Sequence, residues 1–136
     1  MTTNAIRVRT EPDFYAPFKI AQAYRVGDVI YVSGQAAVDD DGSIVGVGDF
    51  DRQAEKSLEN LGRVLAAGGS GLSKLIKVTI FLRDMTNFPK IVSLRERYFT
   101  PPYPADTIVE VSSLALPELE FEIEAIALAD GEVIDR

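Results

Sequence analysis

The sequence predicts an α+β fold, in which a mixed β-sheet carries two helices packed on one of its faces. Two segments, 50–67 and 86–99, place apolar residues at helical spacing, and shorter segments before, between and after them have strand character. Both helical segments lie between strand segments, and helices that cross between strands imply a mixed sheet. The predicted order, ββ(β)αβαββ, therefore indicates one layer of sheet and one layer of helix.

The first part of the chain contains two predicted strands, at 18–24 and 28–34. The second is the stronger of the two, because its Val-Ile-Tyr-Val run is bounded by glycines. Residues 39–43, DDDGS, have the composition of a turn. The SIVGVG segment at 43–48 is predicted as a short third strand.

The first helix is predicted over 50–67, with Asp49 as its N-terminal cap. Gly68 and Gly69 follow the last apolar position and end the helix. We expect its apolar stripe to pack on the sheet. The stripe has steps of four, three and four and consists of Ala54, Leu58, Leu61 and Leu65.

A second strand and helix follow. Residues 74–82 are apolar on both faces, which predicts an interior strand whose outer face is covered by a partner, and so favours an oligomer. The next helix, 86–99, has Thr86 or Asn87 as its expected cap and Pro89 in its first turn. Its inward-facing residues are expected to be Phe88, Ile91, Leu94 and Tyr98.

The last two strands are predicted at 106–114 and 119–128, joined by a turn around Pro117. Along the second of them acidic residues alternate with apolar ones, so the acids share one face. Glutamate is a poor strand former, and like charges on one face repel each other. We therefore expect this face to border a wet cleft or interior rather than a dry core. The row of acids consists of Glu118, Glu120, Glu122 and Glu124.

Composition restricts the partners. The 136 residues suffice for one domain, 1–136, and their formal net charge is −7. Lys and Arg are scattered rather than gathered in a basic stripe, so nucleic acid is not an expected partner. No apolar run approaches the roughly 18 residues of a membrane span, the N-terminus lacks a secretory signal pattern, and there is no cysteine for disulfides. A cytoplasmic protein without membrane contact is expected.

The chain contains neither histidine nor cysteine. This excludes a Ser-His-Asp triad, a cysteine nucleophile and a zinc site with histidine ligands. Any catalysis must use carboxylates, Lys, Tyr, Ser or Thr, backbone amides or bound water.

Five segments in order resemble the Rid family, also called YjgF-type proteins. They are VGDVIYVSGQ (26–35), GDFDRQAEKSLENLGRVLAAGG (48–69), KVTIFLRDMTNF (77–88), PAD followed by VEV (104–111) and EIEAIA (122–127). The resemblance implies a chorismate-mutase-like fold and a homotrimer whose sheets form a central barrel. It also implies small-metabolite clefts between neighbouring subunits.

The resemblance further implies hydrolysis of reactive imines and enamines to ketoacids and ammonia, with no metal or organic cofactor. In the family a glutamate of the EIEAIA motif positions water, and this residue falls on Glu122. The SGQ residues that contribute to the cleft fall on Ser33, Gly34 and Gln35.

Three side chains of the family's deaminase site differ in this chain. The substrate-binding arginine, which follows Pro-Ala, is replaced by Asp106, and the asparagine position falls on or near Val92. The tyrosine position falls near Ile20, although Phe18 can supply a ring, and Ile108 completes the predicted ligand-binding set. We expect little or no hydrolysis of 2-aminoacrylate-type imines, because a carboxylate cannot make arginine's bidentate contact with a substrate carboxylate.

Glu122 and Asp106 are the predicted catalytic residues. If both carboxylates point into one cleft, they share a proton, and one of them can serve as a general acid or base near neutral pH. Such a cleft would prefer a neutral or amine-bearing ligand. The alternatives are that Asp106 turns outward and caps the loop after Pro104, that Glu122 is a solvated strand residue, and that Ser33 merely ends a strand.

Three functions are compatible with these residues. The first is a Rid-type enzyme of altered specificity that hydrolyses an imine, an enamine or a similar small metabolite. The second is a non-catalytic metabolite-binding or regulatory trimer, which the missing arginine favours. The third is an endoribonuclease, a label often given to the family; it is disfavoured because the chain is acidic and has no histidine for proton transfer to phosphate.

Overall fold

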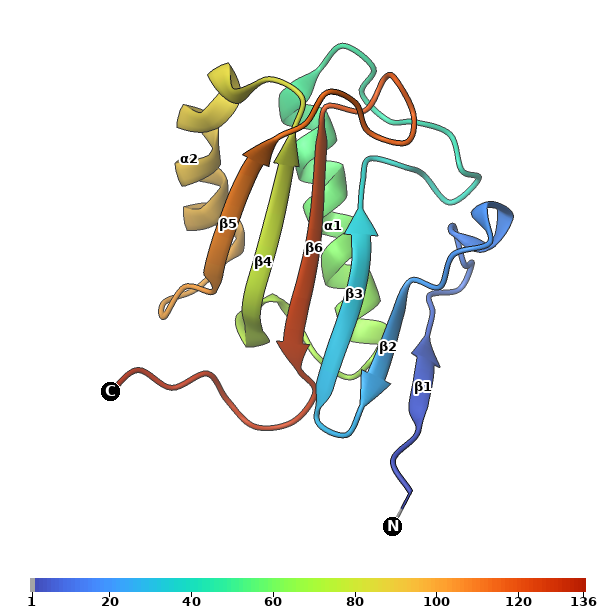
Figure 1. Ribbon diagram of the computed structural model, residues 1–136, viewed down its shortest axis with the longest axis vertical. Coiled ribbons are helices and arrows are strands. Elements are labelled where there is room, and N and C mark those ends of the chain that lie inside the picture. Colours follow the sequence, from blue (N-terminus) through green and yellow to red (C-terminus); the bar gives the residue numbers. More distant parts are fainter. Residues whose placement is uncertain (1) are drawn as a thin grey trace.

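The computed structural model describes residues 2–136 and is built on a six-stranded sheet (Figure 1). The strand order is β1-β2-β3-β6-β4-β5. Strands β4 and β5 are parallel and the other neighbouring strands are antiparallel, so the sheet is mixed, as predicted. The strands are β1 (Ala5–Val8), β2 (Ala23–Val26), β3 (Val29–Gln35), β4 (Leu75–Leu82), β5 (Ala105–Glu110) and β6 (Phe121–Leu128).

Two helices, α1 (Phe50–Ala67) and α2 (Phe88–Tyr98), pack on the same face of the sheet. Figure 1 shows α1 behind strands β6 and β3, and α2 beside β5. Leu58 of α1 and Ile91 of α2 meet Ile80 of the sheet in one buried core. The α+β class and the placement of both helices on one face are confirmed. No helix among residues 2–136 covers the other face, which we call the open face.

Helix α1 begins and ends where the sequence predicts. The side chain of Asp49 accepts a hydrogen bond from the Arg52 amide at 3.1 Å, which caps the first turn. Gly68 is the C-terminal cap, and Gly69 follows with a positive φ of 82° that favours glycine. All four residues of the predicted apolar stripe are buried.

Helix α2 begins differently from its prediction. Asp84 caps a preceding 3₁₀ turn, Met85–Asn87, by accepting from the Thr86 amide at 2.9 Å. Asn87 occupies the cap position of α2 without a side-chain hydrogen bond, so neither Thr86 nor Asn87 caps the helix through its side chain. Phe88 does not face inward, because 41% of it is exposed.

The first 50 residues differ most from the prediction. Only the end of 18–24 is strand, since Ala16–Phe18 form a 3₁₀ turn and β2 starts at Ala23. Strand β1 was not predicted, because its short, largely exposed sequence has no apolar run. The predicted strand at 43–48 is reduced to a single bridge between Val38 and Ile44, because its glycines lie in left-handed turns.

Candidate functional site

A cleft of about 400 Å³ opens where β3 and β6 meet the loops at one end of the sheet. Five of the predicted site residues line it: Phe18, Ile20, Ser33, Gly34 and Glu122. Most of the remaining wall is apolar and comes from the segments 36–38 and 115–119. The structure therefore brings the first strand region and the EIEAIA strand together, as the sequence predicts.

Glu122 lies on β6 with its side chain on the open face and against Gly34 of β3. A Cβ atom at position 34 would lie 2.7 Å from Cδ of Glu122, closer than real contacts allow. The pairing of β3 with β6 shifts register between Val32 and Gln35. The Glu122 side chain packs against β3 at this irregularity. Position 34 must therefore be glycine for Glu122 to keep this position.

The environment of Glu122 favours its protonated form. Burial raises the pKa of the Glu122 carboxyl above its usual value, and the negative charge of Glu124, two residues along the same face, raises the pKa further. A carboxyl group with a raised pKa can exchange protons with a ligand at a pH closer to neutral. The row of acids thus changes the chemistry of the one carboxyl that enters the cleft.

Tyr15 is a cleft residue that the sequence analysis missed. Its hydroxyl donates a hydrogen bond to the Gly34 carbonyl oxygen. Burial raises the pKa of Tyr15, the Glu122 charge raises the pKa further, and a hydrogen bond from the Ala36 backbone opposes them. The 3₁₀ turn that follows Tyr15 turns the chain back and lets this ring enter the cleft beside Phe18. The family resemblance placed the tyrosine position near Ile20 instead.

Ser33 is held as a hydrogen-bond donor to its own chain. Its hydroxyl donates to the Ala21 carbonyl at 2.6 Å, and its amide donates to the Gln22 carbonyl at 2.9 Å. Gln35, by contrast, does not line the cleft. It is fully buried on the helix side of β3, and its side-chain Nε2 donates to the Ser33 carbonyl at 3.1 Å. Gln35 therefore supports the strand behind the cleft.

Two buried amides of α1 hold the loops that wall the cleft. Gln53 donates to the Glu118 carbonyl at 2.8 Å and accepts from the Glu120 amide at 2.8 Å. Asn60 donates to the Ala36 carbonyl at 3.0 Å and, at 2.9 Å, to the carbonyl of residue 38. Both side chains are fully buried, so these loops are fixed to the helix rather than free. The last strand, β6, begins at residue 121 rather than at the predicted 119, because residues 118–120 belong to this fixed loop.

Asp106 does not line the Glu122 cleft of its own chain, so a cleft shared by the two carboxylates stays a prediction about neighbouring subunits. Asp106 pairs with the buried Val78, which in turn pairs with Ala125 on the helix side. Glu122 is three residues from Ala125 and therefore points to the opposite face. Asp106 Oδ2 instead accepts from Nε of Arg95 on α2 at 3.0 Å. The loop-capping alternative is wrong, because Asp106 bonds to Arg95 and its other carboxylate oxygen has no hydrogen-bond partner.

The two remaining predicted residues lie on the same side as Asp106. Val92 is on α2 and 47% exposed. Ile108 is on β5 and packs against the main core. Neither lines the Glu122 cleft of its own chain. The candidate residues therefore form two groups, one around Glu122 and one along the β5–α2 edge.

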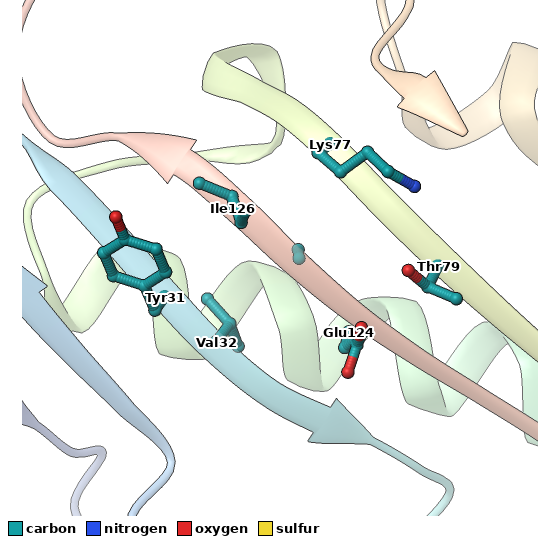
Figure 2. A pocket seen from close by; sticks show the side chains of 7 residues that line it. Tyr31, Val32, Lys77, Thr79, Glu124 and Ile126 are labelled. Carbon is teal, nitrogen blue, oxygen red and sulfur yellow. The ribbon is translucent and has the colours of Figure 1, made fainter. Parts of the chain in front are cut away.

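A shallower hollow of about 260 Å³ lies on the open face itself (Figure 2). Figure 2 shows Tyr31 on β3, Glu124 on β6 and Lys77 on β4 standing on the side away from α1. Tyr31 is half exposed, as is its cross-strand neighbour Tyr24. The open face therefore leaves two aromatic rings exposed in the single chain.

Comparison with known proteins identifies the family. The family model described as endoribonuclease L-PSP matches residues 9–129. The chain belongs to this family. Solved relatives in the same group bear the Rid name, so the predicted Rid membership is confirmed. The structure of RidA from an Antarctic Psychrobacter species has a TM-score of 0.77 and 27% identity, covering 94% of this chain and 98% of that one.

Two curated relatives show how far the similarity extends. A RutC family protein from Pyrococcus abyssi is 34% identical, over 93% of this chain and 98% of its own length. A protein from Dermatophagoides farinae, named 2-iminobutanoate/2-iminopropanoate deaminase, is 31% identical, over 81% of this chain and 85% of its own. Within residues 2–136, no helix is long and apolar enough to cross a membrane.

Proposed function

We propose that the chain forms a homotrimer that binds a small metabolite in a cleft between subunits. The support is the separation of the two residue groups: Glu122 and Asp106 lie on opposite faces of one sheet. A neighbouring copy that packs its β5–α2 edge near the Glu122 cleft would bring the groups together. The open face with its exposed tyrosines supplies a surface for such packing.

The proposed reaction in this cleft is the hydrolysis of an imine or enamine. Water adds to the carbon of the C=N bond, the nitrogen takes a proton, and the resulting carbinolamine splits into a carbonyl compound and ammonia. Glu122 would accept a proton from the attacking water and return it to the leaving nitrogen. Two observations support this role. Glu122 is the half-buried carboxyl in a cleft whose lining is otherwise mostly apolar, and burial raises the pKa of Glu122.

The proposed substrate is not 2-aminoacrylate of the standard kind. The carboxylate of such a substrate needs a cation, and the family's arginine position holds Asp106. Arg95 does not replace that arginine freely, because its guanidinium is already paired with Asp106 at 3.0 Å. We expect imine decay in the presence of this protein to be far slower than with an arginine-bearing relative.

A second candidate is a non-catalytic metabolite-binding or regulatory trimer. Asp106 favours it, because an acid at the family's substrate-binding position removes an attraction that turnover of carboxylate-bearing imines requires. RNA cleavage, which the family's description suggests, is not proposed. The chain has a net charge of −7 and no histidine.

Ammonia release distinguishes these candidates. Oxidases would generate imines freshly from a panel of amines and amino acids, and ammonia and carbonyl products would be followed with and without the protein. We expect acceleration with at least one imine, loss of it in Glu122→Gln, and retention in Glu132→Gln, which removes an exposed carboxylate outside the cleft lining. Glu122-dependent binding without any acceleration would establish the non-catalytic function instead.

A further inference from the structure

We infer that the Glu122 cleft selects a ligand that carries an amine on a small apolar body and discriminates against carboxylates. This rests on the proposed metabolite-binding function of the cleft. The sequence led to a similar expectation by placing Asp106 beside Glu122, but within one chain the two carboxylates lie on opposite faces of the sheet. The inference now depends on which groups of the cleft can donate and which can accept hydrogen bonds.

The side-chain hydroxyls of the cleft have already used their hydrogens. Tyr15 donates its hydroxyl hydrogen to the Gly34 carbonyl. Ser33 donates its hydroxyl hydrogen to the Ala21 carbonyl at 2.6 Å. A hydroxyl has one hydrogen, so what Ser33 still offers to a ligand is an oxygen lone pair. Glu122, when ionised, offers acceptors only.

No lysine or arginine occurs among the lining residues that the structure describes, and on the neighbouring β5–α2 edge that the proposed trimer adds, Arg95 is already paired with Asp106 at 3.0 Å. A ligand carboxylate would therefore meet the Glu122 carboxylate and acceptor oxygens without a cation to offset the repulsion, and it would lose its water. An ammonium group has the opposite character, since it carries three donors and a positive charge. The polar groups of the cleft thus complement an amine.

The rest of the cleft fits the apolar part of such a ligand. Phe18, Ile20, Leu116 and Leu119 line it, and its volume of about 400 Å³ lies within the range of small-molecule sites. The loop that carries Leu116 and Leu119 is held by Gln53 through its hydrogen bonds with residues 118 and 120. An aliphatic or aromatic body can contact this wall while its amine reaches Glu122.

The state of Glu122 adds a pH signature. Burial and the Glu124 charge raise the pKa of Glu122. Below that pKa the carboxyl is protonated, and it must lose its proton before it can pair with an ammonium group. An alkylamine stays protonated up to about pH 10. Amine affinity should therefore rise with pH through the pKa of Glu122 and then level off. A neutral ligand of the same shape should lack this rise.

Three probes with nearly the same carbon skeleton test the inference: 3-methylbutan-1-amine, 3-methylbutan-1-ol and 3-methylbutanoate. Binding to the full chain would be measured by NMR titration across pH 4 to 8. We expect the amine to bind at least about tenfold more tightly than the carboxylate at pH 8, the difference that one charge-assisted hydrogen bond produces. Glu122→Gln should weaken the amine about tenfold and leave the alcohol unchanged.

Glu132→Gln is the control, because it removes an exposed carboxylate in the C-terminal segment that does not line the cleft. Thermal unfolding would check that each variant is folded. Equal or tighter binding of the carboxylate, no effect of Glu122→Gln on the amine, or no binding of any probe would overturn the inference. Glu122-dependent hydrolysis of an imine that lacks a carboxylate would leave the proposed function intact even then. Amine binding without any imine hydrolysis would contradict only the proposed hydrolytic function.

Discussion

The guanidinium of Arg95 lies 3.0 Å from the carboxylate of Asp106, on the face of the sheet opposite to Glu122. The side chains are 25% and 15% exposed, so water screens the pair only partly. The resemblance to Rid-type deaminases implies a substrate-binding arginine at the position of Asp106, and in this structure Asp106 binds an arginine of its own chain. The pair therefore couples the edge strand β5 to helix α2.

We expect Asp106→Ala to lower the free energy of unfolding by about 1–2 kcal/mol, because Arg95 would be left half-buried without its partner. The loss of stability should lie near the lower of these values. Asp106→Ala also removes the second carboxylate oxygen, which is buried without a hydrogen-bond partner in the wild type. Urea denaturation measures it. Asp51→Ala is the control: its pair with Lys90 is 65% and 49% exposed, and its removal should change stability by less than about 0.5 kcal/mol.

Asp106 also shows where sequence reasoning reaches its limit. The family motif identified its position, but the face to which it points depends on strand pairing that the motif does not contain. By contrast, helix α1 could be predicted in full, because its cap, its apolar stripe and its terminal glycines are all local signals. Tyr15 could not be predicted, because a non-repetitive turn rather than a periodic element carries it into the cleft.

Gly34→Ala should damage the site more than the fold. The backbone at position 34 has no positive φ, so alanine is not strained there, but its Cβ would lie 2.7 Å from Cδ of Glu122. Glu122 must then move away from this position, which costs little stability because the contacted atoms are the end of a flexible side chain. We expect ligand binding and any imine hydrolysis to be lost while the chain still folds. Gly71→Ala, where a Cβ meets nothing within 4 Å, should preserve both; equal effects of the two variants would contradict this account.

Gln53→Ala should loosen the cleft wall. The change leaves the Glu118 carbonyl and the Glu120 amide without their buried partner, which costs about 2–3 kcal/mol. Amide hydrogen exchange should accelerate at Glu120. Ser57→Ala is the control, because Ser57 is equally buried one turn further along α1 but bonds only to the Gln53 carbonyl of its own helix. If exchange at Glu120 is unchanged in Gln53→Ala, the hydrogen bonds of Gln53 do not hold the loop before β6 in place.

The homotrimer itself can be tested on the open face. Light scattering in dilute buffer should give about 45 kDa, three times the chain mass of 14.9 kDa. Tyr31 stands on the open face beside Ile126 and is half exposed in the single chain (Figure 2), so Tyr31→Asp would place a charge in the subunit interface. We expect this variant to dissociate and to lose ligand binding at Glu122, because each cleft would lack the neighbouring β5–α2 edge. Ile134→Asp, in the exposed C-terminal segment, should remain a trimer. A wild-type monomer that binds ligand through Glu122 would show that one chain makes a complete site and that the β5–α2 edge has no part in it.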